Sequence, residues 1–243
     1  MRQSAIIEKL RAAIAHVEAA PTRHAVLPFG VPEIDKRLPA GGLATGALHE
    51  VIGSDALADD AAATVFLAGI LARTDGTVFW CLRWRDLFAP ALHLAGLHPD
   101  RVIFVETRTD TNVLVAMEEC LRHEGLGGVV GELGRLSLTA SRRLQLAAEK
   151  SGVAAFVFRR AMAVNAAVSG SAAATRWRVR AVPSEDLGVP SLSRPRWSLS
   201  LERARGGEPH QWIVEACDAQ GRIALPAVSA YRAAATEARQ AAA

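Results

Sequence analysis

The amino-acid sequence predicts an α/β protein in which helices cover a mainly parallel β-sheet. Five short apolar runs, rich in β-branched and aromatic residues, are typical of strands that are buried on both faces. They alternate with segments whose apolar residues recur at helical spacing, which indicates right-handed βαβ units. Three segments near the C-terminus alternate polar and apolar residues with a period of two, which predicts antiparallel strands that extend the sheet.

The first expected element is an amphipathic helix over residues 4–19, which Pro21 ends. Its apolar side chains recur every three or four residues and therefore share one face. These residues are Ile6, Leu10, Ile14 and Val17. Because a linker over 21–28 separates this helix from the rest of the chain, it can dock on its own core or on a neighbouring molecule. We identify its apolar face as a candidate partner-binding surface.

The α/β domain starts with a short helical turn over 31–38, which Pro32 opens, and a glycine turn at Gly41 and Gly42. The strands expected after it are 48–52, 77–82, 101–106, 129–133 and 153–158. The helices expected with them are 59–73, 87–97, 111–124 and 139–151. For the last helix the expected N-cap is Thr139 or Ser141, since a hydroxyl oxygen can accept a hydrogen bond from a free backbone N–H there.

The pattern changes after the fifth strand. Residues 161–175 are rich in alanine and serine, and we expect them to form a loop. The period-two strands follow at 175–181, 196–203 and 211–216, and a turn joins the last two as a hairpin. We therefore expect an N-terminal helix (1–20), an α/β domain (21–225) and an alanine-rich tail (226–243), which is either a frayed helix or disordered.

The composition excludes several classes of protein. The N-terminus lacks the continuous apolar core of a signal peptide, and no later stretch approaches a membrane span. The 3 cysteines form no CxxC pair, which argues against a zinc knuckle or a disulfide framework and is typical of a reducing cytosol. None of the 7 histidines lies in an HExxH or catalytic-triad spacing. We expect a cytoplasmic protein without a metal or a cofactor.

Residues 41–64 have the order glycine turn, short strand, loop and helix, which is the framework of a P-loop nucleotide site. In such a site backbone N–H groups cradle phosphate, a lysine reaches the terminal phosphates, and a Ser/Thr hydroxyl holds magnesium. Counted from Gly53, the corresponding positions hold Ala58, Asp59 and Asp60. A carboxylate about 4 Å from a phosphate oxygen is unfavourable by about 4 kcal/mol at an effective dielectric near 20. We therefore expect no ATP binding in the usual pose, and we expect the aspartates to cap the positive end of the following helix.

Arginines are concentrated in the C-terminal third of the chain, where few acids oppose them, which favours an anionic partner, an acidic protein surface or simply a solvated face. On period-two strands, Trp177 and Trp197 are expected to face the core, and the arginines next to each tryptophan are expected to face water. The residues predicted to contact single-stranded DNA or a protein partner are Arg176, Trp177, Arg178, Arg180 and Arg196.

The order of elements resembles the RecA recombinase core, with the lead-in 35–38, the turn Gly41-Gly42-Leu43 and the strand between Gly46 and Gly53. The Thr-Arg-Trp-Arg segment at 175–178 and the Arg-Trp strand with its Arg-Gly-Gly hairpin are similar to ImuA, the RecA-related family of the bacterial mutasome. The likeness spans about residues 25–220. It implies a role in damage-induced translesion synthesis, together with an ImuB-like inactive Y-family polymerase and an error-prone polymerase.

The resemblance to RecA also implies a set of residues that an active ATPase of this type would need. These are the P-loop lysine and hydroxyl, a glutamate beyond the second strand, and an acid after the hydrophobic Walker B strand. Only the last has a match, Glu132, whereas the second strand is followed by Arg83, Trp84 and Arg85. A glutamine-type sensor is also missing, since Arg159 and Arg160 end the fifth strand. We expect Glu132 to be a vestige of the magnesium site or a salt-bridge partner of Arg83 or Arg85.

The sequence thus predicts a non-catalytic RecA-like adaptor that binds an ImuB-like protein. Its degenerate nucleotide site consists of Gly53, Ala58, Asp59, Asp60 and Glu132. Two other functions stay open, a single-stranded DNA-binding module and a divergent NTPase with an atypical phosphate site. RecA, an error-prone polymerase and a second copy of the chain are further partners that the sequence leaves open.

Overall fold

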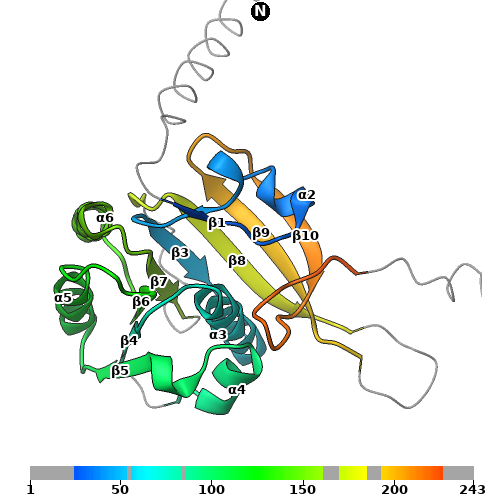
Figure 1. The fold of residues 1–243 in the computed structure, drawn as a ribbon, viewed down its shortest axis with the longest axis horizontal. Helices are drawn as coiled ribbons and strands as arrows, with labels where there is room; N and C mark the ends of the chain where they lie inside the picture. Colours follow the sequence, from blue (N-terminus) through cyan, green and yellow to red (C-terminus); the bar gives the residue numbers. More distant parts are fainter. Residues whose placement is uncertain (1–24, 54–55, 84–85, 161–169, 185–192, 227–243) are drawn as a thin grey trace, which may run out of the picture.

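Eight strands form one mixed sheet in the order β10-β9-β8-β3-β7-β6-β4-β5 (Figure 1). The computed structural model describes residues 25–53, 56–83, 86–160, 170–184 and 193–226. The strands of the sheet are β3 (Leu48–Ile52), β4 (Val78–Leu82), β5 (Val102–Glu106), β6 (Gly128–Leu133), β7 (Ala155–Arg159), β8 (Thr175–Val182), β9 (Arg196–Ala204) and β10 (His210–Glu215). A separate antiparallel pair consists of β1 (Val26–Leu27) and β2 (Leu43–Ala44). The helices are α2 (Pro32–Asp35), α3 (Leu57–Ala72), α4 (Ala89–Leu94), α5 (Asp110–Cys120) and α6 (Leu138–Ser151), with short 3-10 turns at η1 (Pro39–Gly41) and η2 (Pro99–Arg101).

The strand directions match the sequence pattern. The strands β3, β7, β6, β4 and β5 are parallel to their neighbours, and their apolar runs are joined by helical crossovers. On the other side of β3, β8 is also parallel, and β9 and β10 then continue in antiparallel order. The prediction of a mainly parallel sheet with antiparallel C-terminal strands is confirmed, and β8 is the strand at which the direction changes.

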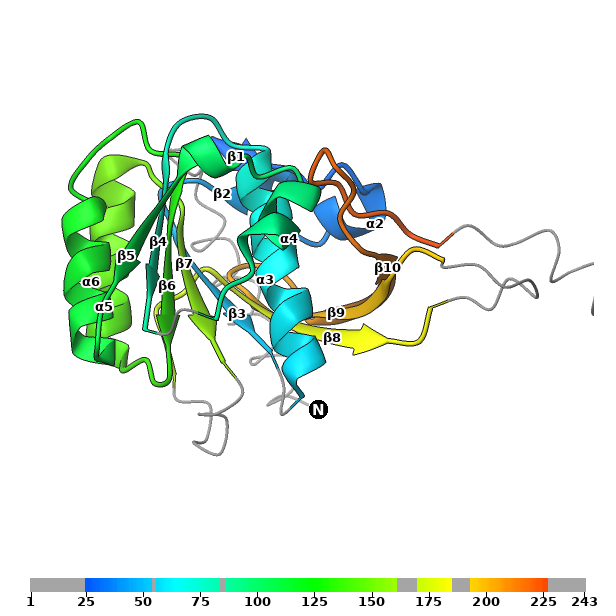
Figure 2. The ribbon, with the colours of Figure 1, turned by 90° about the horizontal axis from the view of Figure 1, so that it is seen from below.

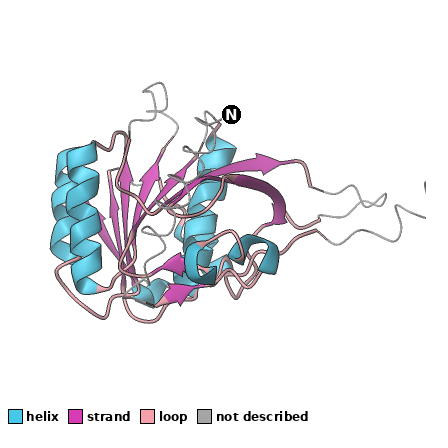
Figure 3. Ribbon diagram, turned by 90° about the horizontal axis from the view of Figure 1, so that it is seen from above, coloured by secondary structure: helices cyan, strands magenta, loops and turns pink. Residues whose placement is uncertain are grey.

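Helices cover both faces of the parallel half of the sheet. Figure 2 shows α5 and α6 on one face and α3 and α4 on the other. In Figure 3 the strands β8, β9 and β10 curve away beyond α3, outside the layer that α5 and α6 cover. The C-terminal strands therefore have one face against the α3 core and one face that no helix of the described residues covers.

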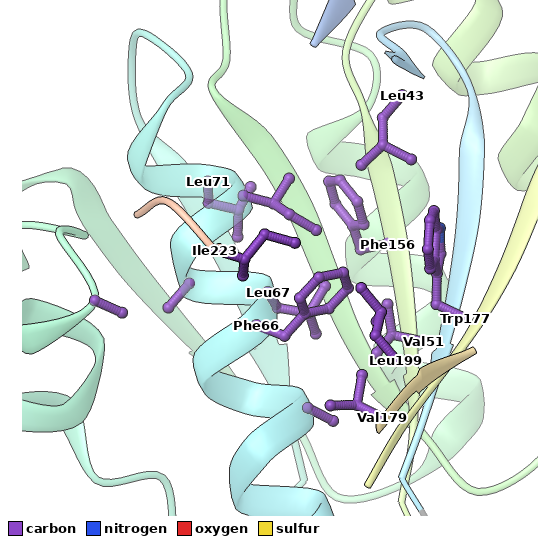
Figure 4. Close-up of a cluster of buried hydrophobic side chains, with 14 of the residues drawn as sticks. Leu43, Val51, Phe66, Leu67, Leu71, Phe156, Trp177, Val179, Leu199 and Ile223 are labelled. Atoms are coloured by element: carbon purple, nitrogen blue, oxygen red, sulfur yellow. The ribbon is translucent and has the colours of Figure 1, made fainter. Parts of the chain in front are cut away.

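An aromatic cluster fills the core between α3 and the sheet (Figure 4). Phe66 of α3 lies 6.0 Å from Trp177 of β8 and 6.3 Å from Trp197 of β9, measured between ring centroids. Phe29 stacks on Phe66 at 5.8 Å, which attaches the segment before α2 to the same core. Since burying one large apolar side chain contributes about 1.5–3 kcal/mol, this cluster holds the C-terminal strands against α3.

A second core lies under α5 and α6. Val113 and Met117 of α5 and Leu144 of α6 are fully buried against β6 and β7. Gly131 of β6 is required there, because a methyl group at this position would lie 2.1 Å from the Met117 sulfur. The α/β layers are therefore packed on both sides of β6.

A buried histidine links the two small strands to the sheet. His49 Nε2 lies 2.9 Å from the Ala44 carbonyl, which can only accept, so this nitrogen carries the proton. His49 Nδ1 then accepts from the Thr175 hydroxyl at 2.8 Å, and Trp177 Nε1 donates to that hydroxyl oxygen at 2.9 Å. Burial lowers the pKa of His49 to about 4, so the neutral ring that this chain of hydrogen bonds needs is the stable form.

Several element ends differ from the sequence prediction. The N-cap of α6 is Ser137, whose hydroxyl accepts from Ala140 N at 3.1 Å. Ser141, one of the two residues expected there, instead donates to the Leu138 carbonyl inside the helix. α4 is shorter than expected because the left-handed backbone of Gly96, with φ +87°, ends the helical path.

Some predictions lie outside the described residues. These are the helix over 4–19 with its partner-binding face, most of the loop 161–175 and the tail from 227. In the described part of the chain, no helix is both long and apolar enough to cross a membrane.

Candidate functional site

The degenerate P-loop lies at the edge of the sheet where the parallel strands end, which is the edge where open α/β sheets bind their ligands. Gly53 follows β3, Glu132 lies near the end of β6, and Arg160 follows β7. The first turn of α3 adds Asp59 and Asp60. The fold therefore brings together four of the five residues predicted for this site, and Arg160 with them. Ala58, the fifth, is exposed on the first turn of α3.

Arg160 lies among three carboxylates at this edge. Its two terminal nitrogens each lie 2.7 Å from an oxygen of Asp86, which is a bidentate pair. Its Nη1 also lies 3.3 Å from Glu132 Oε2, and its Nε lies 3.7 Å from Asp60 Oδ2. Trp80 Nε1 donates to the other oxygen of Glu132 at 2.9 Å. One guanidinium thus contacts all three carboxylates and offsets part of the negative charge that they bring into the site.

The contacts in this network shift the pKa values of Glu132, Asp86 and Arg160. Burial raises the pKa of Glu132, while the hydrogen bond from Trp80 and the charge of Arg160 oppose the rise. The pKa of Asp86 is lowered, chiefly by its hydrogen bonds from Arg160. The same hydrogen bonds are the largest reason why the pKa of Arg160 is raised. Arg160 therefore stays charged in the folded protein.

The expected ion pair of Glu132 with Arg83 was wrong. Arg83 forms an ion pair with Asp110 at 2.7 Å instead, and Arg85 lies outside the described residues. Asp110 also accepts hydrogen bonds from the backbone N–H groups of Gly134 and Arg135. Arg83 consequently joins β4 to the start of α5, away from Glu132.

Both aspartates lie in the first turn of α3, at the positive end of the helix, and each also has a specific contact. The N-cap position is Ala56, which has no side-chain cap. Asp59 Oδ1 accepts a hydrogen bond from the backbone N–H of Ala181 in β8 at 2.7 Å. Asp60 packs against Gly53 so closely that a methyl group there would lie 2.1 Å from Asp60 Oδ1. The carboxylate of Asp60 therefore fills the space beside Gly53 at the end of β3.

The side chains at the P-loop positions do not fit a nucleoside triphosphate with bound magnesium. The lysine position of a P-loop holds Asp59 and the hydroxyl position holds Asp60, both buried at 7% and 5% exposure. A phosphate group here would meet two carboxylates, and it would compete with them for Arg160. Among the described residues, no group of three or more His, Cys, Asp or Glu side chains is arranged to hold a metal ion.

The arginines of β8 are less accessible than the sequence pattern predicts. Trp177 is fully buried, as expected. Arg176, however, pairs with the buried Glu50 at 2.6 Å, and Arg178 pairs with Glu202 of β9. The prediction that these two arginines face water is wrong, because the neighbouring strands supply carboxylates on the same face. Of the arginines on β8, Arg180 is the exposed one.

Comparison with known proteins decides the family. The proteins named ImuA in two strains of Caulobacter vibrioides (NA1000 / CB15N, and ATCC 19089 / CIP 103742 / CB 15) are each 40% identical to this chain over 209 residues. That match covers 80% of this chain and 84% of each relative. This chain belongs to the ImuA family. No model of a protein family matches it.

The fold of this ImuA-family chain is RecA-like. The crystal structure of the RadB recombinase superimposes on it with a TM-score of 0.60 at 16% sequence identity. The superposition covers 83% of this chain and 100% of that chain. The sequence therefore identified both the family and the fold correctly.

Two members of the site in this ImuA-family chain were missed by sequence reasoning. Asp86 lies just beyond the arginines that follow β4, so it gave no motif signal of its own. Trp80 lies inside an apolar strand, where its indole N–H is indistinguishable in sequence from a simple core residue. Arg160 was noticed only as the replacement of a sensor glutamine, although a lone arginine at a buried strand end is itself a signal for nearby carboxylates.

Proposed function

We propose that this chain is a non-catalytic RecA-like adaptor in damage-induced translesion synthesis, and that it binds an ImuB-like inactive Y-family polymerase. The observation that carries the proposal is the position of Arg160 among Asp60, Asp86 and Glu132. The region that holds phosphate and magnesium in a P-loop ATPase is here occupied by the protein's own ion pairs.

Membership of the ImuA family supports the mutasome part of this proposal. The non-catalytic part rests on electrostatics. For ATP to bind in the usual pose, Arg160 would leave carboxylates that are almost completely buried, and both Asp59 and Asp60 would face phosphate. Separating a buried ion pair costs about 3–5 kcal/mol, which is a large fraction of the binding free energy of a micromolar ligand, about 8 kcal/mol.

Calorimetric titration with ATP and magnesium, together with a phosphate-release assay, tests the non-catalytic part. We expect neither heat of binding nor turnover above the rate of a heat-inactivated sample. The opposite result, ATP turnover that disappears in Glu132→Gln, would establish a divergent NTPase in place of an adaptor.

Co-purification with the ImuB-like protein tests the adaptor part. Leu10→Asp with Ile14→Asp places two charges on the predicted apolar face of the N-terminal helix, and we expect it to abolish the pull-down. A matched control, Ala12→Asp with Ala15→Asp, adds the same two charges to the opposite face of the predicted helix and should leave the pull-down intact. Circular dichroism of both variants checks that the α/β core remains folded. Equal binding by the two variants would exclude the helix as the docking element.

Binding of single-stranded DNA is the second candidate function, and the exposed Arg180 favours it. Arg176 and Arg178 are unsuitable for this test because their loss would leave Glu50 and Glu202 unpaired. Arg180→Ala alone should weaken binding and reduce the salt dependence by about one phosphate contact. Absence of measurable oligonucleotide binding by the unaltered chain would remove this candidate.

A further inference from the structure

Arg159, the last residue of β7, is a buried arginine whose side chain has no hydrogen bond or ion pair with the described residues. Its exposed fraction is only 4%. Its Nε is fully buried and has no hydrogen-bond partner. In the part of the chain that the structure describes, its guanidinium forms no ion pair either, in contrast to Arg160 beside it. An uncompensated buried charge is costly, so this guanidinium is arranged for a group that the protein does not itself supply.

The strand register places two further arginines beside it. Ile52 of β3 is in register with Arg159 of β7 on one side and with Arg178 of β8 on the other. Neighbouring strands lie about 4.8 Å apart, so the backbones of Arg159 and Arg178 are about 10 Å apart, and residues in register project from the same face. Arg176 precedes Arg178 by two residues and therefore shares that face. Three long basic side chains can reach one point at this end of the strands.

The charges in this cluster do not balance. Glu50 pairs with Arg176, and Glu202 pairs with Arg178. Among the described residues, no carboxylate then forms an ion pair with Arg159. Burial lowers the pKa of Arg159, Glu50 opposes this, and Arg176 and Arg178 lower it further. The cluster thus has one cation in excess and lacks one anion.

A fixed wall of backbone borders the cluster. The Ser171 hydroxyl accepts from Arg176 at 3.3 Å, and the Ser171 carbonyl accepts from Arg203 at 2.6 Å. One residue later, Ala172 N donates to the Ser141 hydroxyl of α6 at 3.0 Å. These contacts hold the segment before β8 in place. Arg176 is therefore oriented before any ligand arrives, which favours binding because little entropy of this side chain is lost.

We propose that Arg159, assisted by Arg176 and Arg178, binds a phosphate group at the ends of β7, β3 and β8. A guanidinium presents several N–H groups in one plane and matches the oxygens of phosphate in a bidentate manner. This site lies on the sheet face opposite α3, whereas the Arg160 network lies on the α3 side, so it is separate from the degenerate nucleotide site. The inference does not depend on the adaptor proposal, and either can fail without the other.

Thermal unfolding of the full chain in sodium phosphate, compared with sodium chloride at equal ionic strength, tests the site. The variants are Arg159→Met, which removes the charge but keeps a long apolar side chain, and Arg142→Met, which removes an exposed arginine of α6 as the matched control. Phosphate stabilises most proteins slightly by exclusion from their surface, and both variants retain that general effect. We expect a larger shift of Tm in the unaltered chain and in Arg142→Met than in Arg159→Met. Equal shifts in all three proteins would overturn the proposal.

Direct binding measurements show whether the bound phosphate group belongs to a nucleic acid or to a small molecule. Titration of the chain with inorganic phosphate by ³¹P NMR, and with a fluorescent single-stranded oligonucleotide by anisotropy, forms the two arms. Loss of a charged hydrogen-bond donor weakens binding by about tenfold or more, so Arg159→Met should raise Kd at least that much in one arm. An effect in the oligonucleotide arm identifies a nucleic-acid backbone, and an effect confined to inorganic phosphate identifies a small phosphate ligand.

Arg159→Lys keeps the positive charge but lacks the planar guanidinium. This variant distinguishes a loss of phosphate binding from a loss of folding. We expect it to fold as well as the unaltered chain and to bind phosphate with an intermediate Kd. If sodium acetate shifts Tm as much as phosphate does, or if the Kd of Arg159→Met is unchanged in both arms, the proposal is wrong.

Discussion

The replacement Arg160→Met offers the sharpest test of the ion-pair network. It removes the guanidinium and leaves three carboxylates, of which Glu132 and Asp60 have side chains only 2% and 7% exposed. The contact with Asp86, whose side chain is 51% exposed, contributes at most about 1 kcal/mol. The larger effect comes from the two buried carboxylates, because breaking a buried pair on one side costs about 3–5 kcal/mol.

The expected loss is measurable in a simple unfolding experiment. For a chain of this size 1 kcal/mol corresponds to about 2–4 °C in Tm, so Arg160→Met should lower Tm by about 6–20 °C. Urea unfolding followed by circular dichroism gives the free energy of unfolding directly. The control Arg122→Met breaks an exposed pair with Glu119, with side chains 72% and 64% exposed, and should cost less than about 1 kcal/mol.

The pH dependence of the same variant separates electrostatics from packing. Burial raises the pKa of Glu132 and the charge of Arg160 opposes this rise, so removing Arg160 should raise that pKa further above its value in the unfolded chain. The folded state then binds more protons, so stability falls as pH rises through that window. The loss in Arg160→Met should therefore be smaller at pH 5 than at pH 8, and adding Glu132→Gln should recover part of it. A loss no larger than that of Arg122→Met, independent of pH, would refute the reasoning.

Two further predictions concern stability. Since the pKa of His49 is about 4 in the folded protein and near 6.5 in the unfolded chain, its contribution is complete above pH 6.5 and is lost as pH falls towards 4. The pKa difference corresponds to at most about 3 kcal/mol, and urea unfolding between pH 4.5 and 7 should show a flatter profile in His49→Gln; an unchanged slope would mean that His49 is not the titrating group. Gly53→Ala should cost about 1–3 kcal/mol, because its methyl group would lie 2.1 Å from Asp60 Oδ1. Gly170→Ala adds the same methyl group where no atom lies within 4 Å, so its Tm should stay close to that of the unaltered chain; equal losses in both would contradict the contact.

Much of the fold was readable from local patterns. The apolar runs at β3, β4, β6 and β7 are buried on both faces, as continuous hydrophobic strands should be. Helix ends were less predictable, because a cap depends on one hydroxyl and one backbone N–H. At α6 three hydroxyl residues lie within five positions, and only Ser137 has the extended backbone that a cap requires.

The candidate site was predictable in part. Its degenerate P-loop positions follow from counting along the chain, since a P-loop is one continuous segment. The pairing of Glu132 with Arg160 did not follow, because an ion pair between two strands depends on how the strands are ordered in the sheet. Arg160 lies 28 residues from Glu132 and 74 from Asp86, yet the neighbouring strands β7, β6 and β4 bring the three residues together.

By itself the sequence determined the RecA-like order of elements, the ImuA family and the loss of the phosphate-binding lysine and hydroxyl. These depend on periodicity and on the identity of single residues in one continuous segment. The tertiary structure alone decided that Arg160 contacts Asp60, Asp86 and Glu132, and that the buried Nε of Arg159 beside it has no hydrogen-bond partner among the described residues. Adjacent residues at a strand end point to opposite faces of the sheet, so two neighbouring arginines meet entirely different charges.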